Sequence, residues 1–251
     1  MFKKKFFDIA SDFYDEMLNP NNLISSGEKR ISKIIEGEDI TTAADLGCGS
    51  GNDTIALAMN NIRATGFDNS PQMIKIAKEK ALKQGLDVEF VCSALNQIDP
   101  EYHDKFDLAI SFGNTFSNIK PLQIPDTLEK VNLILKKGKK FYLQVLNYKN
   151  FIMKKQVEIL NVTKGSDNIF VRFNEVNIRD NTIGFNILKI PVNNPNGYSL
   201  IKTKLYPYPA SYLKRVLELS GFTNIQVYQD LDRNRFNSNK SRDILIISEK
   251  K

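Results

Sequence analysis

The chain has 251 residues, of which 41% are apolar and 25% are charged, and its formal net charge is +6. This length and composition suit one sizeable α/β domain, or a domain with an insertion, and exclude a disordered chain. No run of about 18 apolar residues occurs, so we expect no membrane span. The lysines are scattered and many face acids at helical spacing, which favours a solvated surface over a nucleic-acid partner.

The first forty residues have a helical pattern. Apolar residues from Phe6 to Leu18 fall on one stripe, and isoleucines from Ile24 to Ile35 indicate a second helix. The basic start, M-F-K-K-K-F-F-D, is followed at once by acids, so we expect no signal peptide. Two cysteines are too few for a disulfide framework, and we expect a cytoplasmic protein.

Strands then alternate with helices. The predicted strands are 42–46, 64–68, 88–92, 106–112 and 140–146, and the predicted helices between them are 53–60, 70–84 and 125–135. A helix over 209–219 and strands over 224–228 and 243–248 complete the pattern. Such alternation is typical of parallel βαβ units with right-handed crossovers.

The pattern changes after residue 150. Residues 169–178 and 182–190 alternate like paired antiparallel strands around the turn R-D-N-T, and 199–206 resembles a third strand. We therefore expect one domain, 1–251, in four parts. These are an N-terminal helical cap (1–40), a cofactor-binding core (41–150), an antiparallel β insertion that serves as a substrate lid (151–206), and a final helix and β-hairpin of the core sheet (207–251).

The stretch A-D-L-G-C-G-S-G-N-D, from Ala44 to Asp53, joins a predicted strand to a glycine turn. In open parallel sheets ligands bind at such strand ends. The glycine order departs from the dinucleotide fingerprint G-x-G-x-x-G, and Asp45 would repel a pyrophosphate but favour a ligand with positive charge. S-adenosylmethionine fits, since it has an adenosine, a sulfonium and an ammonium group but no phosphate.

A second acid, Asp68, ends the next strand. It follows the glycines at nearly the spacing, roughly 20 residues, expected of an acid that holds ribose hydroxyls. The alternative is an acid placed near the N-terminus of a helix that Ser70 caps. Asp45, Asp68 and the glycines together favour a cofactor site over a structural loop.

These motifs resemble the class I S-adenosylmethionine-dependent methyltransferases over residues 43–148, with a fainter likeness over 205–250. The segments that carry the resemblance are D-L-G-C-G-S-G, T-G-F-D-N-S-P-Q-M, K-F-D-L-A-I-S and L-Q-V-L-N-Y. The resemblance implies a Rossmann-like α/β sheet of seven strands, the last antiparallel, with S-adenosylmethionine as cofactor and no metal. It implies cofactor contacts from Tyr14, Asp45, Gly47, Cys48, Gly49, Asp68, Asn69, Ala94, Leu95, Phe112 and Asn118.

The segment S-F-G-N-T-F-S-N, Ser111 to Asn118, is similar to one in the glycine and sarcosine N-methyltransferase group. That group has an arginine directly before an Asn-Tyr pair, where this chain has Leu146, and a histidine where it has Asn118. We therefore predict a small acceptor other than glycine, with an apolar or aromatic body. The candidate aromatic walls are Phe112, Phe116, Tyr148 and Tyr208, for each of which a place in the core is the alternative.

A strict requirement for a free carboxylate would instead indicate that another cation replaces the missing arginine. The candidate is Arg172, on the predicted insertion. Its alternative role is a charge that protects an edge strand.

Methyl transfer is an in-line displacement at a carbon that the sulfonium already activates, so positioning dominates. A neutral amine needs no base, whereas a hydroxyl would want one. Asn114 and Tyr148, which follow the fourth and fifth predicted strands, are the catalytic candidates that orient the acceptor, together with Asn147. The alternative role of Asn114 is to cap the loop in which it lies. The only histidine, His103, precedes the fourth strand and is expected at the surface.

The two cysteines, Cys48 and Cys92, would end strands one and three. In the sheet that the resemblance implies, one strand separates them, so they would lie roughly 10 Å apart, too far for a disulfide. We expect both to be buried thiols.

The sequence favours a methyltransferase that acts on an amine or hydroxyl of a small molecule. An RNA or protein methyltransferase stays open because the pI is about 9.1, although no N-P-P-Y-type tetrapeptide follows strand four. A regulatory protein that binds the cofactor without turnover also stays open. Asp45 and the glycine order exclude an NAD-dependent dehydrogenase.

Overall fold

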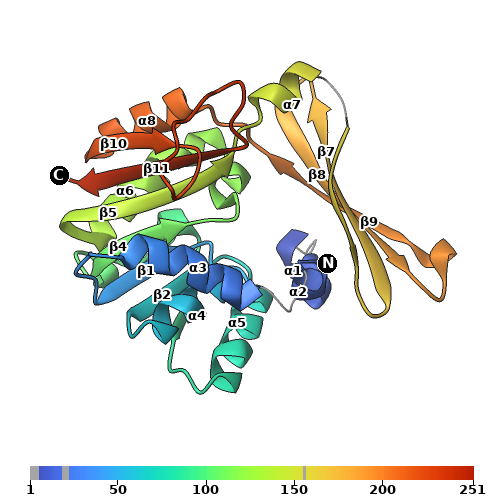
Figure 1. Ribbon diagram of the computed structural model, residues 1–251, viewed down its shortest axis with the longest axis horizontal. Coiled ribbons are helices and arrows are strands. Elements are labelled where there is room, and N and C mark those ends of the chain that lie inside the picture. Colours follow the sequence, from blue (N-terminus) through green and yellow to red (C-terminus); the bar gives the residue numbers. More distant parts are fainter. Residues whose placement is uncertain (1–5, 19–22, 155–156) are drawn as a thin grey trace.

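The computed structural model describes residues 6–18, 23–154 and 157–251. Its large sheet has seven strands in the order β10-β11-β5-β4-β1-β2-β3 (Figure 1). The strands are β1 (Thr42–Leu46), β2 (Arg63–Asp68), β3 (Glu89–Cys92), β4 (Phe106–Ser111), β5 (Leu135–Leu146), β10 (Phe222–Tyr228) and β11 (Asp243–Lys250). The predicted α/β sheet of seven strands with an antiparallel last strand is confirmed, because β11 runs antiparallel to β5 and β10.

Strand β1 lies inside the sheet, with β2 and β3 beyond it on one side. It pairs in parallel with β2 on one side and with β4 on the other, so the winding of the chain reverses there. Strand β1 is buried along almost its whole length, so its apolar residues, Ala43, Ala44 and Leu46, lie on both faces of the sheet, and Asp45 is a buried acid. The reversal places the loops after β1, β2 and β4 at one edge of the sheet, where a ligand can bind.

Helices cover both faces of this sheet. The helices are α3 (Leu23–Ile35), α4 (Asn52–Met59), α5 (Pro71–Lys83), α6 (Ile124–Ile134) and α8 (Ala210–Leu219). Helices α3 and α4 pack together on one face, and α6 and α8 pack together on the other (Figure 1). Short 3₁₀ turns lie in the connections: η3 (Leu95–Gln97), η4 (Pro100–Tyr102), η5 (Thr115–Asn118), η6 (Pro121–Gln123) and η7 (Pro195–Gly197).

The antiparallel sheet between β5 and α8, here called the inserted sheet, has four strands in the order β6-β7-β8-β9. They are β6 (Glu158–Lys164), β7 (Asn168–Asn177), β8 (Thr182–Pro191) and β9 (Ser199–Leu205), and helix α7 (Lys149–Lys154) precedes them. The sequence predicts β7, β8 and β9 but misses β6 and α7. Strand β6 carries a bulge between Ile159 and Asn161, which breaks the alternation that would reveal it.

The N-terminal stripe forms two short helices, not one. Helix α1 (Phe6–Ala10) and helix α2 (Tyr14–Met17) are joined by the 3₁₀ turn η1 (Ser11–Phe13). The Ser11 hydroxyl donates to the Asp8 carbonyl oxygen at 3.0 Å, a local bond that competes with helical pairing. Residues 1–5 and 19–22 of the expected cap, and 155–156 of the insertion, lie outside the described residues.

The N-terminal helices lie between the large sheet and the inserted sheet (Figure 1). Asp15 on α2 accepts hydrogen bonds from Ser50 Oγ at 2.7 Å and from Lys80 Nζ at 3.0 Å. Phe13 of η1 stacks on Phe170 of β7, with ring centroids 5.3 Å apart. These contacts fix the helices to both sheets. None of the described helices is long and apolar enough to span a bilayer.

Candidate active site

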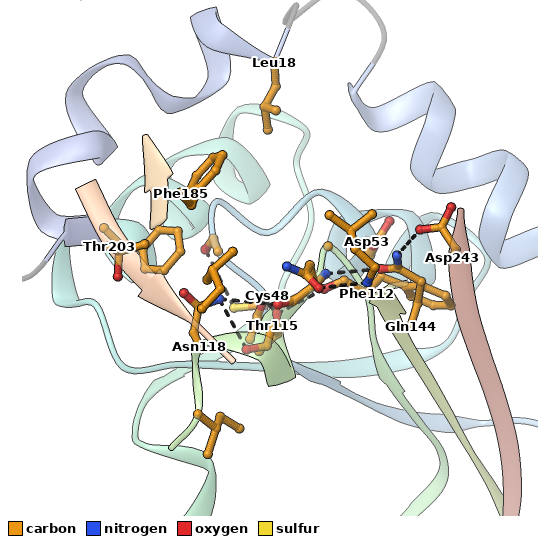
Figure 2. Close-up of a pocket in the computed structure, with 18 of the residues that line it drawn as sticks. Leu18, Cys48, Asp53, Phe112, Thr115, Asn118, Gln144, Phe185, Thr203 and Asp243 are labelled. Atoms are coloured by element: carbon orange, nitrogen blue, oxygen red, sulfur yellow. Dashed lines mark hydrogen bonds between the residues drawn. The ribbon is translucent and has the colours of Figure 1, made fainter. Parts of the chain in front are cut away.

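A cavity of about 1340 Å³ lies between the carboxyl ends of the large sheet, the N-terminal helices and the inserted sheet. Figure 2 shows Phe185 and Thr203 of the inserted sheet on one side of it and Cys48 and Asn118 of the large-sheet loops on the other. Ligand pockets commonly measure about 300–1000 Å³. This cavity therefore has room for two molecules side by side.

The candidate residues that the sequence assigns to the site all line this cavity. They are Tyr14, Asp45, Gly47, Cys48, Gly49, Asp68, Asn69, Ala94, Leu95, Phe112, Asn114, Asn118 and Tyr148. They come from four loops of the large sheet, from α2 and from the end of β5. The fold thus brings them together, while the role of each residue remains a prediction.

The three glycines of the loop after β1, residues 47–51, serve different needs. All three have positive φ. A Cβ on Gly47 would meet the Thr115 side chain at 2.2 Å, and a Cβ on Gly51 would meet Ala77 Cβ at 2.8 Å. A Cβ on Gly49 would meet nothing within 4 Å. Gly47 and Gly51 are therefore required by packing, whereas Gly49 presents open backbone toward the cavity.

Asp68 is fixed at the end of β2 by two backbone amides. Gly49 N donates to one carboxylate oxygen at 3.0 Å, and Ser70 N donates to the other at 2.9 Å. Ser70 also caps α5, since its hydroxyl accepts a hydrogen bond from Met73 N. Burial raises the pKa of Asp68, and these bonds counteract the rise. Each oxygen can still accept a further hydrogen bond, as a ribose diol would supply.

Asp45 lies beneath the loop and is 3% exposed. Its carboxylate accepts a hydrogen bond from Thr54 Oγ1 at 2.7 Å. Burial, together with the nearby charge of Asp53, raises its pKa to about 7. Asp53 itself pairs with Arg30 at 2.6 Å. A cationic ligand beside Asp45 would favour its charged form, so this end of the cavity suits positive charge.

Asn114 holds the loop after β4 against β5. It has a φ of 66°. Its Oδ1 accepts from Leu146 N at 2.9 Å and from Ser117 Oγ at 2.8 Å, and its Nδ2 donates to Tyr148 Oη at 2.7 Å. The amide is thus engaged within the protein, as the loop-capping alternative for Asn114 requires, and its role toward an acceptor remains a prediction. Burial raises the pKa of Tyr148 well above its usual value, so the phenol keeps its proton and can donate it in a hydrogen bond but cannot act as a base.

Several expectations need correction. Phe116 and Tyr208 are buried in the core and do not line the cavity, unlike Phe112 and Tyr148. Cys92 is exposed rather than buried, because it ends β3, the edge strand of the sheet.

Cys48 is half-buried and unpaired. His103 is half-buried rather than a fully exposed surface residue, and it lies at the opposite end of β4 from the cavity. Asn147 lines the cavity, but its amide is used by the neighbouring loop, since Nδ2 donates to Ser238 O and Ser241 O.

The position of Arg172 excludes the alternative that it protects an edge strand. It lies on β7, an interior strand of the inserted sheet, and it lines the cavity. Asn161, Asn174, Phe185 and Thr203 of the same sheet line it too. The sequence analysis missed these four, because their alternation predicts strands without indicating which face meets the cofactor core.

Comparisons with known proteins agree with this geometry. Residues 43–138 match the family described as a methyltransferase domain. The chain is 31% identical to the ribosomal RNA small subunit methyltransferase G of Mycoplasma capricolum and 34% identical to the carboxy-S-adenosyl-L-methionine synthase of Campylobacter jejuni. Each match covers 51% of this chain and 56% of the relative, so the chain spans about half the length of the curated relatives it matches.

Solved structures extend the likeness to the whole fold. The methyltransferase CcbJ of Streptomyces caelestis has a TM-score of 0.82 at 18% identity and 99% coverage of both chains. The sugar N-methyltransferase KedS8 of Streptoalloteichus has a TM-score of 0.71 at 12% identity, over 100% of this chain and 95% of that one. At such identities these likenesses establish the fold, including the inserted sheet.

The part of the chain that holds the glycine loop and Asp68 is a class I S-adenosylmethionine-dependent methyltransferase domain. S-adenosylmethionine is the cofactor of this class. The likenesses do not single out the glycine and sarcosine N-methyltransferase group, which remains a prediction from the loop after β4.

Proposed function

We propose that the protein transfers a methyl group from S-adenosylmethionine to an amine or hydroxyl of a small-molecule acceptor. The observation that carries the proposal is the shared cavity. The cofactor-type residues Asp45, Gly49 and Asp68 line one part of it, and the inserted sheet lines the facing part. The cofactor would lie along the strand ends, and the acceptor would approach its methyl group from the inserted sheet, which acts as the substrate lid.

The chemistry proposed is an in-line displacement at the methyl carbon. Its main requirement is orientation, because holding the acceptor in line with the methyl group lowers the activation barrier. Tyr148 is protonated and hydrogen-bonded to Asn114, so this pair would position the acceptor rather than remove its proton. A neutral amine needs no base, and we favour an amine for that reason. The loop from Ser111 to Asn118 supports the same choice through its likeness to amine-methylating enzymes.

A small acceptor is favoured over RNA because the N-terminal helices and the inserted sheet form further walls of the cavity beside the cofactor-type residues. The similar fold of a sugar N-methyltransferase is consistent with this. RNA remains the second candidate, since a ribosomal RNA methyltransferase is among the relatives and the net charge is +6. The location we propose is the cytoplasm, where the unpaired Cys48 and Cys92 would stay reduced.

The test is the formation of S-adenosylhomocysteine from S-adenosylmethionine across a panel of small amines, small alcohols and total RNA. We expect turnover with at least one small amine larger than glycine, and poor turnover with glycine at millimolar concentration. Calorimetry with S-adenosylmethionine runs in parallel. Binding without turnover on any acceptor would indicate a regulatory protein, and methylation of RNA alone would establish the second candidate.

A further inference from the structure

The face of the inserted sheet that meets the cavity is divided into bands. At one end Phe170 and Ile187 pack on the N-terminal helices. At the other end Ile183 and Leu205 pack on Tyr148 near the end of β5. Between these two apolar clusters lies a polar band, which lines the cavity and comprises Asn161, Arg172, Asn174 and Thr203. The polar band therefore faces the space left for the acceptor.

The register of the strands places these side chains on two adjacent rungs. Asn161 of β6 lies opposite Arg172 of β7. Asn174 lies two residues further along β7 and so on the same face. It is paired with Phe185, which is paired in turn with Thr203. Phe185 adds an aromatic ring, and Glu158, which is paired with Asn174, also lines the cavity. The facing wall therefore offers one cation, one carboxylate, two amides, a hydroxyl and a ring.

Arg172 is the only charged member of the polar band. Asn161 Oδ1 accepts a hydrogen bond from Arg172 Nε, and the Asn161 amide is held in turn by Thr163, at 2.9 Å. None of the ion pairs between the described residues includes Arg172. The guanidinium is thus oriented through one edge, while its two terminal nitrogens have no carboxylate partner.

Its electrostatic surroundings agree with this. Burial lowers the pKa of Arg172, the Tyr14 phenol counteracts the change, and Arg242 at the rim of the cavity adds a second positive charge. Glu158 lies beside Asn174 in the strand register and also lines the cavity, but it is exposed to solvent and forms no ion pair with Arg172. A partly desolvated guanidinium without a counter-ion is costly, and a bound anion would offset that cost.

We propose that Arg172, oriented by Asn161, binds an oxyanion of the methyl acceptor, so that the acceptor is an anionic amine or alcohol. This inference rests on the proposed function and names its substrate class. It differs from the expectation drawn from Leu146 alone, because the cation that is missing beside the Asn-Tyr pair is supplied from the facing sheet. Leu146 then contacts the apolar body of the acceptor. A carboxylate and a phosphate share the chemistry that a guanidinium fork recognises.

The competing occupant is the carboxylate of the cofactor itself. Arg30 is better placed for that group, because it pairs with Asp53 close to the glycine loop and lies 5.8 Å from the Phe112 ring centroid. A variant of Arg172 that leaves cofactor affinity intact separates the two possibilities.

The experiment compares Arg172→Gln with Arg179→Gln. Arg179 is an exposed arginine in the turn between β7 and β8 and lies outside the cavity, so it controls for loss of one charge from the same sheet. The first arm uses leucine and phenylalanine against their amides, and the second uses phosphoethanolamine against ethanolamine. KM and kcat are measured where methylation occurs. Calorimetry records the binding of each compound to the complex with S-adenosylhomocysteine, a readout that needs no turnover.

We expect the wild type to prefer the anionic member of at least one pair by tenfold or more in KM or Kd. Arg172→Gln should abolish that preference with little change in kcat, and Arg179→Gln should retain it. The Kd of S-adenosylhomocysteine should stay within twofold in both variants. Equal binding of anionic and neutral members by the wild type, or weaker binding of S-adenosylhomocysteine by Arg172→Gln, would overturn the inference. Loss of turnover with all acceptors while anion binding persists would contradict only the proposed function.

Discussion

At the scale of single residues, Asp45 should make the affinity for S-adenosylmethionine depend on pH. Its carboxyl has a pKa of about 7 because it is buried and lies near Asp53. From pH 6 to pH 8 its ionised fraction should rise from about one tenth to about nine tenths. If the carboxylate attracts the permanent sulfonium charge, affinity for S-adenosylmethionine should rise about tenfold over this range and then level off. Calorimetry at several pH values measures this.

The matched variant is Asp45→Asn, which keeps the shape and removes the titration. It should bind S-adenosylmethionine more weakly, and with an affinity that does not change from pH 6 to pH 8. An unchanged slope in this variant would assign the titration to another group. In the cofactor-free protein, a rise in pH has the opposite effect on the stability that this residue contributes. The raised pKa means that the folded state retains a proton which the unfolded state releases above its value of 3.8, so this residue's contribution to stability declines as pH rises toward 7.

At the scale of elements, substitutions of glycines can distinguish a loss of stability from a loss of cofactor binding at the glycine loop. Gly49→Ala and Gly85→Ala both force alanine into positive φ with open space around the new Cβ, and each should cost about 1–2 kcal/mol of stability. Only Gly49 lines the cavity, so only Gly49→Ala should also weaken S-adenosylhomocysteine binding, by tenfold or more. Gly51→Ala should lose more stability than either, because its Cβ would lie 2.8 Å from Ala77 Cβ.

Urea unfolding and calorimetry measure the two effects separately. Equal loss of affinity in Gly49→Ala and Gly85→Ala would mean that the loop acts only through general stability. Normal affinity in Gly49→Ala would remove the glycine loop from the cofactor site.

Elements with a strong local signal were predicted closely. Two elements lie where the sequence places them: the strand at Thr42–Leu46 and the helix from Pro71, with Ser70 as its cap. A buried strand and a capped helix can both be recognised from a few neighbouring residues. The bulged strand β6 and the division between α1 and α2 were missed. The bulge between Ile159 and Asn161 breaks the alternation of β6, and the bond from Ser11 to the Asp8 carbonyl oxygen interrupts the helical stripe, so neither feature follows from a periodic pattern.

The same distinction holds for the site. Asp45, Gly49 and Asp68 follow successive strands, and parallel topology alone brings strand ends together. Arg172 enters the cavity only because the inserted sheet folds back over the core with one particular face inward. Period-two alternation indicates that Arg172 and Asn174 share a face, but not that this face meets the cavity.

At the scale of the whole molecule, three parts enclose one space. The large sheet supplies the cofactor-type residues, the N-terminal helices are fixed to both sheets through contacts such as Asp15 with Ser50, and the inserted sheet supplies the facing wall. Walls on three sides limit the size of the acceptor that can reach the methyl donor. We propose that this cavity holds S-adenosylmethionine, with its ribose on Asp68.

The most direct measurement is calorimetric titration of S-adenosylhomocysteine into the wild type, Asp68→Ala and Asp99→Ala. Asp99 is the matched control: it accepts a backbone amide two residues ahead at 2.9 Å, as Asp68 does, but lies outside the cavity. We expect Asp68→Ala to weaken binding by about 2–3 kcal/mol, or about 30- to 150-fold, through lost hydrogen bonds to a charged group, and Asp99→Ala to bind as the wild type does. Absence of binding to the wild type, or an unchanged Kd in Asp68→Ala, would contradict the account.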